Sequence, residues 1–131
     1  MPEITVKHKG DMEFKTQIGS HKLTIDIPPE NNGKDRGPTP PQLFIASLSS
    51  CIAVFVASYC NNVGISTEGL SVTLSYDKLS NPSCLGNLKA VIRIPKGDVG
   101  KREKAVLRAA ELCLIQETIR LSPEVELALE K

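Results

Sequence analysis

Residues 39–64 constrain the fold of this chain more than any other segment. No proline or glycine interrupts residues 42–61, and residues 47–60 carry no charge. Thr39 can cap a helix, Pro40 suits its first turn, and the NNVG run at 61–64 is typical of a helix end. Apolar side chains fall on nearly all sides of this helix, a pattern typical of burial. We therefore predict a buried central helix of about 20 residues.

The rest of the sequence predicts strands and one further helix. Alternating or β-prone residues predict an antiparallel meander at 3–8, 12–18 and 21–27. A long loop follows at 28–40, rich in Pro, Asn, Gly and Asp. Beyond the central helix we predict strands at 69–79 and 86–95, a second helix over 99–121, and a last strand at 123–130. The chain is then a single α+β domain, 1–131, with the order βββ-α-ββ-α-β.

Composition argues against several classes of partner. The 16 Lys and Arg are balanced by 15 Asp and Glu, giving a net charge of +1. With scattered charges, no Trp and few other aromatic residues, we expect no nucleic-acid partner. No run of about 18 apolar residues is present, so we expect no membrane span.

The candidate reactive side chains of the chain are four cysteines, at positions 51, 60, 84 and 113. With a polar N-terminus instead of a signal peptide, they indicate free thiols and a cytoplasmic protein. No CxxC pair occurs and the two histidines lie far from Cys51 and Cys113, so we predict neither a metal site nor a cofactor. Cys60 is expected to be structural, and Cys84 is expected to lie exposed in a turn.

Cys51 lies in the middle of the predicted central helix. Phe44, Leu48 and Phe55 flank it at helical spacing and form an apolar wall. Burial among them would raise the pKa of the thiol, and a helix dipole gives little help at mid-helix. A reactive Cys51 therefore needs positive charge from elsewhere, whereas a structural Cys51 needs none. Cys113, in RAAELC, is equally ambiguous from its surroundings alone.

Four segments together resemble the OsmC/Ohr-like family of organic hydroperoxide resistance and osmotically induced proteins. They are GPTPPQLFIASLSSC (37–51), YCNNVGI (59–65), RAAELC (108–113) and SPEVEL (122–127). The resemblance implies an α+β fold in which two subunits intertwine as a homodimer around the long helix. Such a dimer would explain why that helix is apolar on nearly all sides.

The resemblance also implies a reaction. Cys51 would be the peroxidatic thiol that attacks a small organic hydroperoxide, and Cys113 would resolve the sulfenic acid as a disulfide. An external dithiol would then reduce that disulfide. The wall of Phe44, Leu48 and Phe55 would favour an apolar substrate.

The sequence departs from the family at the groups that activate the thiol. Peroxidases of this family use an arginine from the N-terminal strands and a glutamate just before the long helix. Here residues 1–35 contain no arginine, and Pro41 and Gln42 stand near the glutamate position, so Arg36 is the candidate cation. A proline commonly follows the resolving cysteine, but here Leu114 does. A non-peroxidase thiol-based binding or sulfur-handling protein of the less characterised OsmC-like branch is therefore the alternative.

Overall fold

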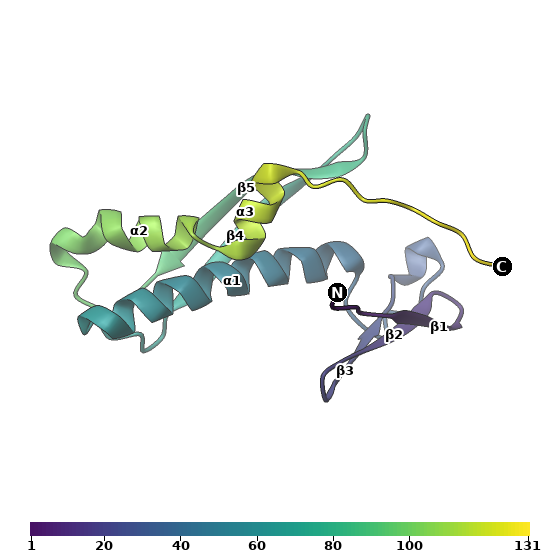
Figure 1. The fold of residues 1–131 in the computed structure, drawn as a ribbon, viewed down its shortest axis with the longest axis horizontal. Coiled ribbons are helices and arrows are strands. Elements are labelled where there is room, and N and C mark those ends of the chain that lie inside the picture. The colour runs from purple at the N-terminus through teal and green to yellow at the C-terminus, as the bar shows by residue number, and fades with distance from the viewer. The chain divides into compact units, whose positions relative to one another are not determined.

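The structure is a computed structural model that describes all residues, Met1–Lys131 (Figure 1). Five strands, three α-helices and two short 3₁₀ helices form a mixed α+β chain, as predicted. The chain divides into two compact units, Met1–Ile45 and Ala46–Lys131, which are described separately. The assignment of 1–131 to a single domain stays a prediction.

The first unit contains the predicted meander. Strands β1 (Val6–Gly10), β2 (Glu13–Ile18) and β3 (His21–Ile25) form an antiparallel sheet in that order. Because side chains alternate across a strand, Phe14, Leu23 and their cross-strand neighbours share one apolar face. The opposite face carries lysines, so the sheet is amphipathic.

The predicted long loop is an ordered structure built around Asp26. It contains the 3₁₀ helix η1 (Pro29–Asn31). The Asp26 carboxylate is fully buried and accepts backbone N–H bonds from Ile27 at 2.8 Å, Lys34 at 3.4 Å and Arg36 at 3.2 Å. Gly33 is required because a Cβ there would lie 1.8 Å from the Ile27 carbonyl oxygen. Burial works to raise the pKa of Asp26, but these hydrogen bonds outweigh it and the pKa is lowered.

Helix α1 (Pro40–Val63) confirms the predicted central helix and is 24 residues long. Its start is a reciprocal capping box: the Gln42 N–H donates to Thr39 Oγ1 at 3.3 Å, and the Thr39 N–H donates to Gln42 Oε1 at 2.9 Å. It stops at Gly64, whose φ of 75° is left-handed. By length and composition α1 could cross a membrane, a property that the core helices of soluble proteins share.

The burial of α1 is one-sided within the single chain. Leu48, Ile52, Val56 and Cys60 are buried along one face, at the spacing of an amphipathic helix. Val54, on another face, is 64% exposed. Within one chain the second unit covers only one face of the helix, so burial on its other sides stays a prediction that depends on a dimer.

A β-hairpin forms the sheet of the second unit. Strands β4 (Ser71–Leu79) and β5 (Cys84–Arg93) pair antiparallel, close to the predicted ranges. Val72, Leu74 and Ile92 pack against the core of this unit. Cys84 begins β5 rather than lying in the turn, and it is exposed as expected.

The predicted second helix over 99–121 is wrong, because the structure divides that segment. It forms the 3₁₀ helix η2 (Gly100–Arg102), then α2 (Glu103–Glu111) and α3 (Leu114–Leu121). Leu112 ends α2, and Cys113 has an extended ψ of 124° and is the N-cap of α3. Cys113 therefore stands at a helix start and not inside a continuous helix.

The predicted last strand is also wrong. Residues 122–131 form no regular structure, and Val125, Leu127 and Leu129 are all at least 80% exposed. Alternation favours a strand, but a strand needs a neighbouring edge to supply its hydrogen bonds, and no strand of this chain does so.

Replacing Asp26 by Asn should lower the midpoint of thermal unfolding at neutral pH, because an amide cannot accept three N–H bonds as a carboxylate does. Since the folded pKa of Asp26 is lowered, its stabilisation is complete above the ordinary value of 3.8 and is lost as the pH falls through the folded pKa. The difference in unfolding midpoint between the wild type and the Asp26→Asn variant should therefore become smaller at acidic pH. Calorimetry from pH 7 to pH 2 tests this, with exposed Asp98→Asn as the control; equal midpoints at pH 7 would contradict it.

Candidate thiol site

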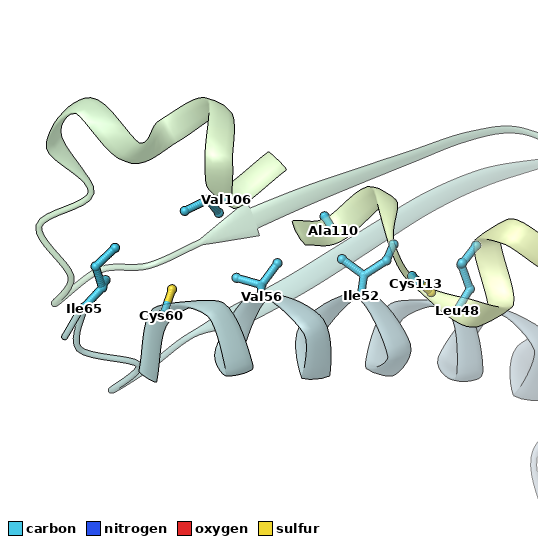
Figure 2. Close-up of a cluster of buried hydrophobic side chains, with 8 residues drawn as sticks. All are labelled: Leu48, Ile52, Val56, Cys60, Ile65, Val106, Ala110 and Cys113. Carbon is cyan, nitrogen blue, oxygen red and sulfur yellow. The ribbon is translucent and has the colours of Figure 1, made fainter. Parts of the chain in front are cut away.

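The core of the second unit brings α1 against the junction between α2 and α3. Figure 2 shows Leu48, Ile52, Val56 and Cys60 projecting from the same side of α1. Val106, Ala110 and Cys113 complete the buried cluster from α2 and the junction, together with Ile65. Cys113 and Cys60 are fully buried, whereas Cys51 is half-buried at the margin of this core. The sequence placed these cysteines in apolar surroundings, and the structure agrees.

Cys51 and Cys113 contact each other. Both are free thiols, and the side chain of Cys113 donates a hydrogen bond to the sulfur of Cys51. The backbone N–H groups of Leu114 and Ile115, the first two residues of α3, also donate to the Cys51 sulfur. Cys51 therefore lies at the N-terminus of a second helix, although it is in the middle of its own.

These contacts shift the pKa values of the two thiols in opposite directions. Burial works to raise the pKa of Cys51, but the hydrogen bonds from Cys113, Ile115 and Leu114 outweigh it, so the pKa is lowered. Burial raises the pKa of Cys113, and the bond to Cys51 raises it further. The N–H of Gln116, which donates to Cys113 at 3.4 Å, offsets only part of that increase. Cys51 is thus the thiol that ionises first.

The other cysteines lack such an environment. Cys60 is fully buried, and burial raises its pKa, which is typical of an inert structural thiol. Cys84 lies on the surface at the start of β5. No group of three or more His, Cys, Asp or Glu side chains could hold a metal ion.

Arg36 is engaged within the first unit. Its guanidinium donates to Glu13 Oε1 at 2.8 Å and lies 3.5 Å from Asp11 Oδ2. Its backbone N–H is bound by the buried Asp26. The structure therefore shows a positioned arginine with carboxylate partners, and its role in catalysis stays a prediction.

The proposed apolar wall divides between the two units. Leu48 is buried in the core beside Ile52, and Phe55 packs partly buried against the same core as Cys51. Phe44 belongs to the first unit and is 39% exposed. Leu48 and Phe55 thus provide apolar surface within the unit that holds Cys51, and the substrate role of all three stays a prediction.

Sequence reasoning missed the backbone donors of α3. No Gly or Pro lies between 101 and 122, so nothing in residue type marked a break at Leu112. A weak signal was available: Cys113 is followed by Glu117 in the first turn and Arg120 in the last turn, the charge order that suits a separate helix.

The chain is thus an α+β protein that holds two free thiols in contact, one with a lowered and one with a raised pKa. The sequence profile of the OsmC-like protein family matches residues 33–128. The chain belongs to this family. Among curated proteins, none is matched by this sequence.

Solved structures support the family fold. An OsmC-like protein from Mycoplasma pneumoniae is 18% identical, with a TM-score of 0.71 over 90% of this chain and 86% of that one. A Legionella pneumophila protein, described as an organic hydroperoxide resistance protein OsmC and a regulator of sulfide bond formation, is 26% identical, with a TM-score of 0.65 over 92% and 90%. The organic hydroperoxide resistance protein OhrB of Bacillus subtilis is 20% identical, with a TM-score of 0.58 over 90% and 89%.

Replacing Leu114 by Pro should raise the pKa of Cys51, because proline removes one of the N–H donors to its sulfur. Proline is tolerated at the first position of a helix, and the extended ψ of 124° at Cys113 suits a residue before proline. Leu114 is 64% exposed, so little packing is lost. The rate of Cys51 alkylation against pH, followed by mass spectrometry, measures the pKa.

Leu114→Ala is the matched control, because alanine removes the same side chain but keeps the N–H. Its alkylation profile should match that of the wild type. Profiles that coincide for the proline and alanine variants would contradict a role for the α3 backbone in stabilising the thiolate.

Proposed function

We propose that this protein reduces small organic hydroperoxides through Cys51 and Cys113, in defence against oxidative stress. The observation that carries the proposal is the contact between the two sulfurs, with the pKa of Cys51 lowered and that of Cys113 raised. A peroxidatic cysteine must be a thiolate, and a resolving cysteine must lie within reach of it. Similarity to proteins described as organic hydroperoxide resistance proteins adds support.

The reaction runs in three balanced steps. The Cys51 thiolate attacks the terminal oxygen of the hydroperoxide; the O–O bond breaks, Cys51 becomes a sulfenic acid, and the alkoxide takes up a proton and leaves as the alcohol. The Cys113 sulfur then attacks the Cys51 sulfur, losing its proton as the sulfenic hydroxyl leaves as water, and a disulfide forms. An external dithiol reduces this disulfide by exchange, is itself oxidised to a disulfide, and restores both thiols.

Positive potential at Cys51 comes from the chain itself in this proposal. The N-terminus of α3 directs two N–H groups at the sulfur, which is equivalent to a partial positive charge. Arg36 would add to it by stabilising the thiolate or the departing alkoxide, with Glu13 fixing its guanidinium. Leu48, Phe55 and Phe44 would bind the apolar part of the substrate.

A homodimer would complete the molecule, and we place it in the cytoplasm because its cysteines are free thiols. The support for a dimer is exposed apolar surface: Val54 on α1 and Val125, Leu127 and Leu129 in the C-terminal segment lie in water in a single chain. A partner copy would bury these individually exposed side chains.

The alternative function is thiol-based binding or sulfur handling without peroxide reduction. It is favoured by Gln42, which stands near the family's glutamate position and whose side chain is engaged in the helix cap. The Legionella protein's description as a regulator of sulfide bond formation points the same way. The two functions differ in whether Cys51 reacts with hydroperoxide faster than an ordinary thiol.

Rapid mixing with cumene hydroperoxide separates them. The wild type should consume it much faster than a free thiol does, and Cys51→Ser should abolish this reaction because the attacking sulfur is gone. Cys113→Ser should keep the first step and accumulate the Cys51 sulfenic acid, which dimedone traps for mass spectrometry. Exposed Cys84→Ser is the control and should match the wild type. Wild-type consumption no faster than that of Cys51→Ser would leave the alternative function standing.

Replacing Val54 by Asp should shift the protein from dimer to monomer, since a buried carboxylate at an apolar interface costs several kcal/mol unless it is paired. Sedimentation equilibrium measures the change. Leu107→Asp, at an exposed leucine of α2, is the control and should leave the assembly unchanged. A wild type that sediments as a monomer, or a Val54 variant that dimerises as tightly, would refute the dimer.

A further inference from the structure

The β1–β2–β3 sheet carries a cluster of lysines on one face. Because partners across the strands share a face, Lys7 and Lys15 lie directly opposite each other, and Lys15 is paired with Thr24 on β3. Lys9 follows Lys7 two residues along β1, and Lys22 is the diagonal neighbour of Lys15 on β3. Four ammonium groups therefore project from one small area of sheet.

The cluster is poorly neutralised. Lys7, Lys9 and Lys22 form no ion pair, and the nearest carboxylate oxygen to Lys15 is that of Glu13, at 3.9 Å. Glu13 is already held by Arg36 at 2.8 Å. Like charges directly opposite each other destabilise a sheet, so this arrangement is costly in the absence of a ligand.

The same face is hollowed. A depression of about 490 Å³ is lined by the four lysines together with Glu3, Thr5, Thr16 and Gln17. This volume lies in the range of small-molecule sites. The edge of the depression is fixed, because Thr16 Oγ1 donates to the Thr5 carbonyl at 2.7 Å and ties the N-terminal segment to β2. The lining offers four cations, one carboxylate, the Thr5 hydroxyl and the Gln17 amide.

We propose that this lysine face binds a small anion that carries two or more linked phosphate groups. Lysine ammonium groups bind phosphate as point charges, and several are needed to match a polyphosphate. The lining contains no aromatic side chain on which a nucleic-acid base could stack, which favours a small polyphosphate over a single-stranded nucleic acid. This site is separate from the thiols, and it holds whether or not the protein reduces hydroperoxides.

Calorimetric titration of the full chain with inorganic triphosphate tests the proposal. We expect one triphosphate per chain, bound more tightly than sulfate at matched ionic strength and weakened by added salt. The double variant Lys7→Gln and Lys15→Gln should weaken binding about a hundredfold, since each lost charge-assisted contact is worth about tenfold. Its thermal midpoint without ligand should equal or exceed that of the wild type, because the repulsion between the two lysines is gone.

The matched control is Lys101→Gln with Lys104→Gln, which removes the same charge from an exposed segment of the other unit. It should bind triphosphate as the wild type does. An equal loss in the control, or triphosphate binding no tighter than sulfate, would overturn the site. A single-stranded oligonucleotide or an acidic peptide that displaces triphosphate and binds more tightly would overturn the assignment to a small polyphosphate.

Discussion

The packing of one face of α1 against the α2–α3 junction is the constraint on which the candidate site depends. Leu48, Ile52 and Val56 hold α1 against that junction, and the burial of each is worth about 1.5 to 3 kcal/mol. The junction is held in turn by the buried Cys113, which caps α3 with its own sulfur. Apolar packing thus brings Cys51 to the start of α3. The acidity of the thiol follows from that position and not from its neighbours along α1.

Local patterns of sequence predicted the elements whose signals are themselves local. The Thr39–Pro40 start and the uninterrupted apolar run predicted α1, and alternation predicted β4, because capping and periodicity act within a few residues. The break before α3 could not be predicted in this way, because Leu112 and Cys113 have no helix-breaking character, and the burial of Cys113 in the core against α1 depends on the tertiary fold. The prediction of a last strand was wrong for a related reason. Alternation at 123–130 gives a segment one apolar face, but it does not supply the neighbouring strand that its backbone hydrogen bonds require. The resemblance to the family identified Cys51 and Cys113 as a pair. Only the structure showed that the two side chains are in contact.

The departures from the family pattern have structural explanations. Gln42, near the family's glutamate position, closes a capping box with Thr39 and so stabilises the start of α1. Arg36 is paired with Glu13 of β2, so an arginine and a carboxylate are present, but the arginine comes from the loop and the carboxylate from the strand. Meanwhile the Cys113 side chain and the N–H groups of Ile115 and Leu114 lower the pKa of Cys51 without any full charge.

The hydrogen bond between the thiols also favours reaction of Cys51 before Cys113 in the proposed mechanism. While Cys51 is a thiolate, it accepts the hydrogen bond of Cys113 and raises the pKa of that thiol, so in the proposed reaction Cys113 would not compete for the hydroperoxide. Oxidation of Cys51 to a neutral sulfenic acid removes the negative charge that Cys113 faces. That contribution to the raised pKa of Cys113 then disappears, while the Gln116 N–H that favours its thiolate remains. In the proposed reaction, the pKa of Cys113 would therefore fall after Cys51 has reacted, whereas burial, the largest cause of its raised pKa, would remain.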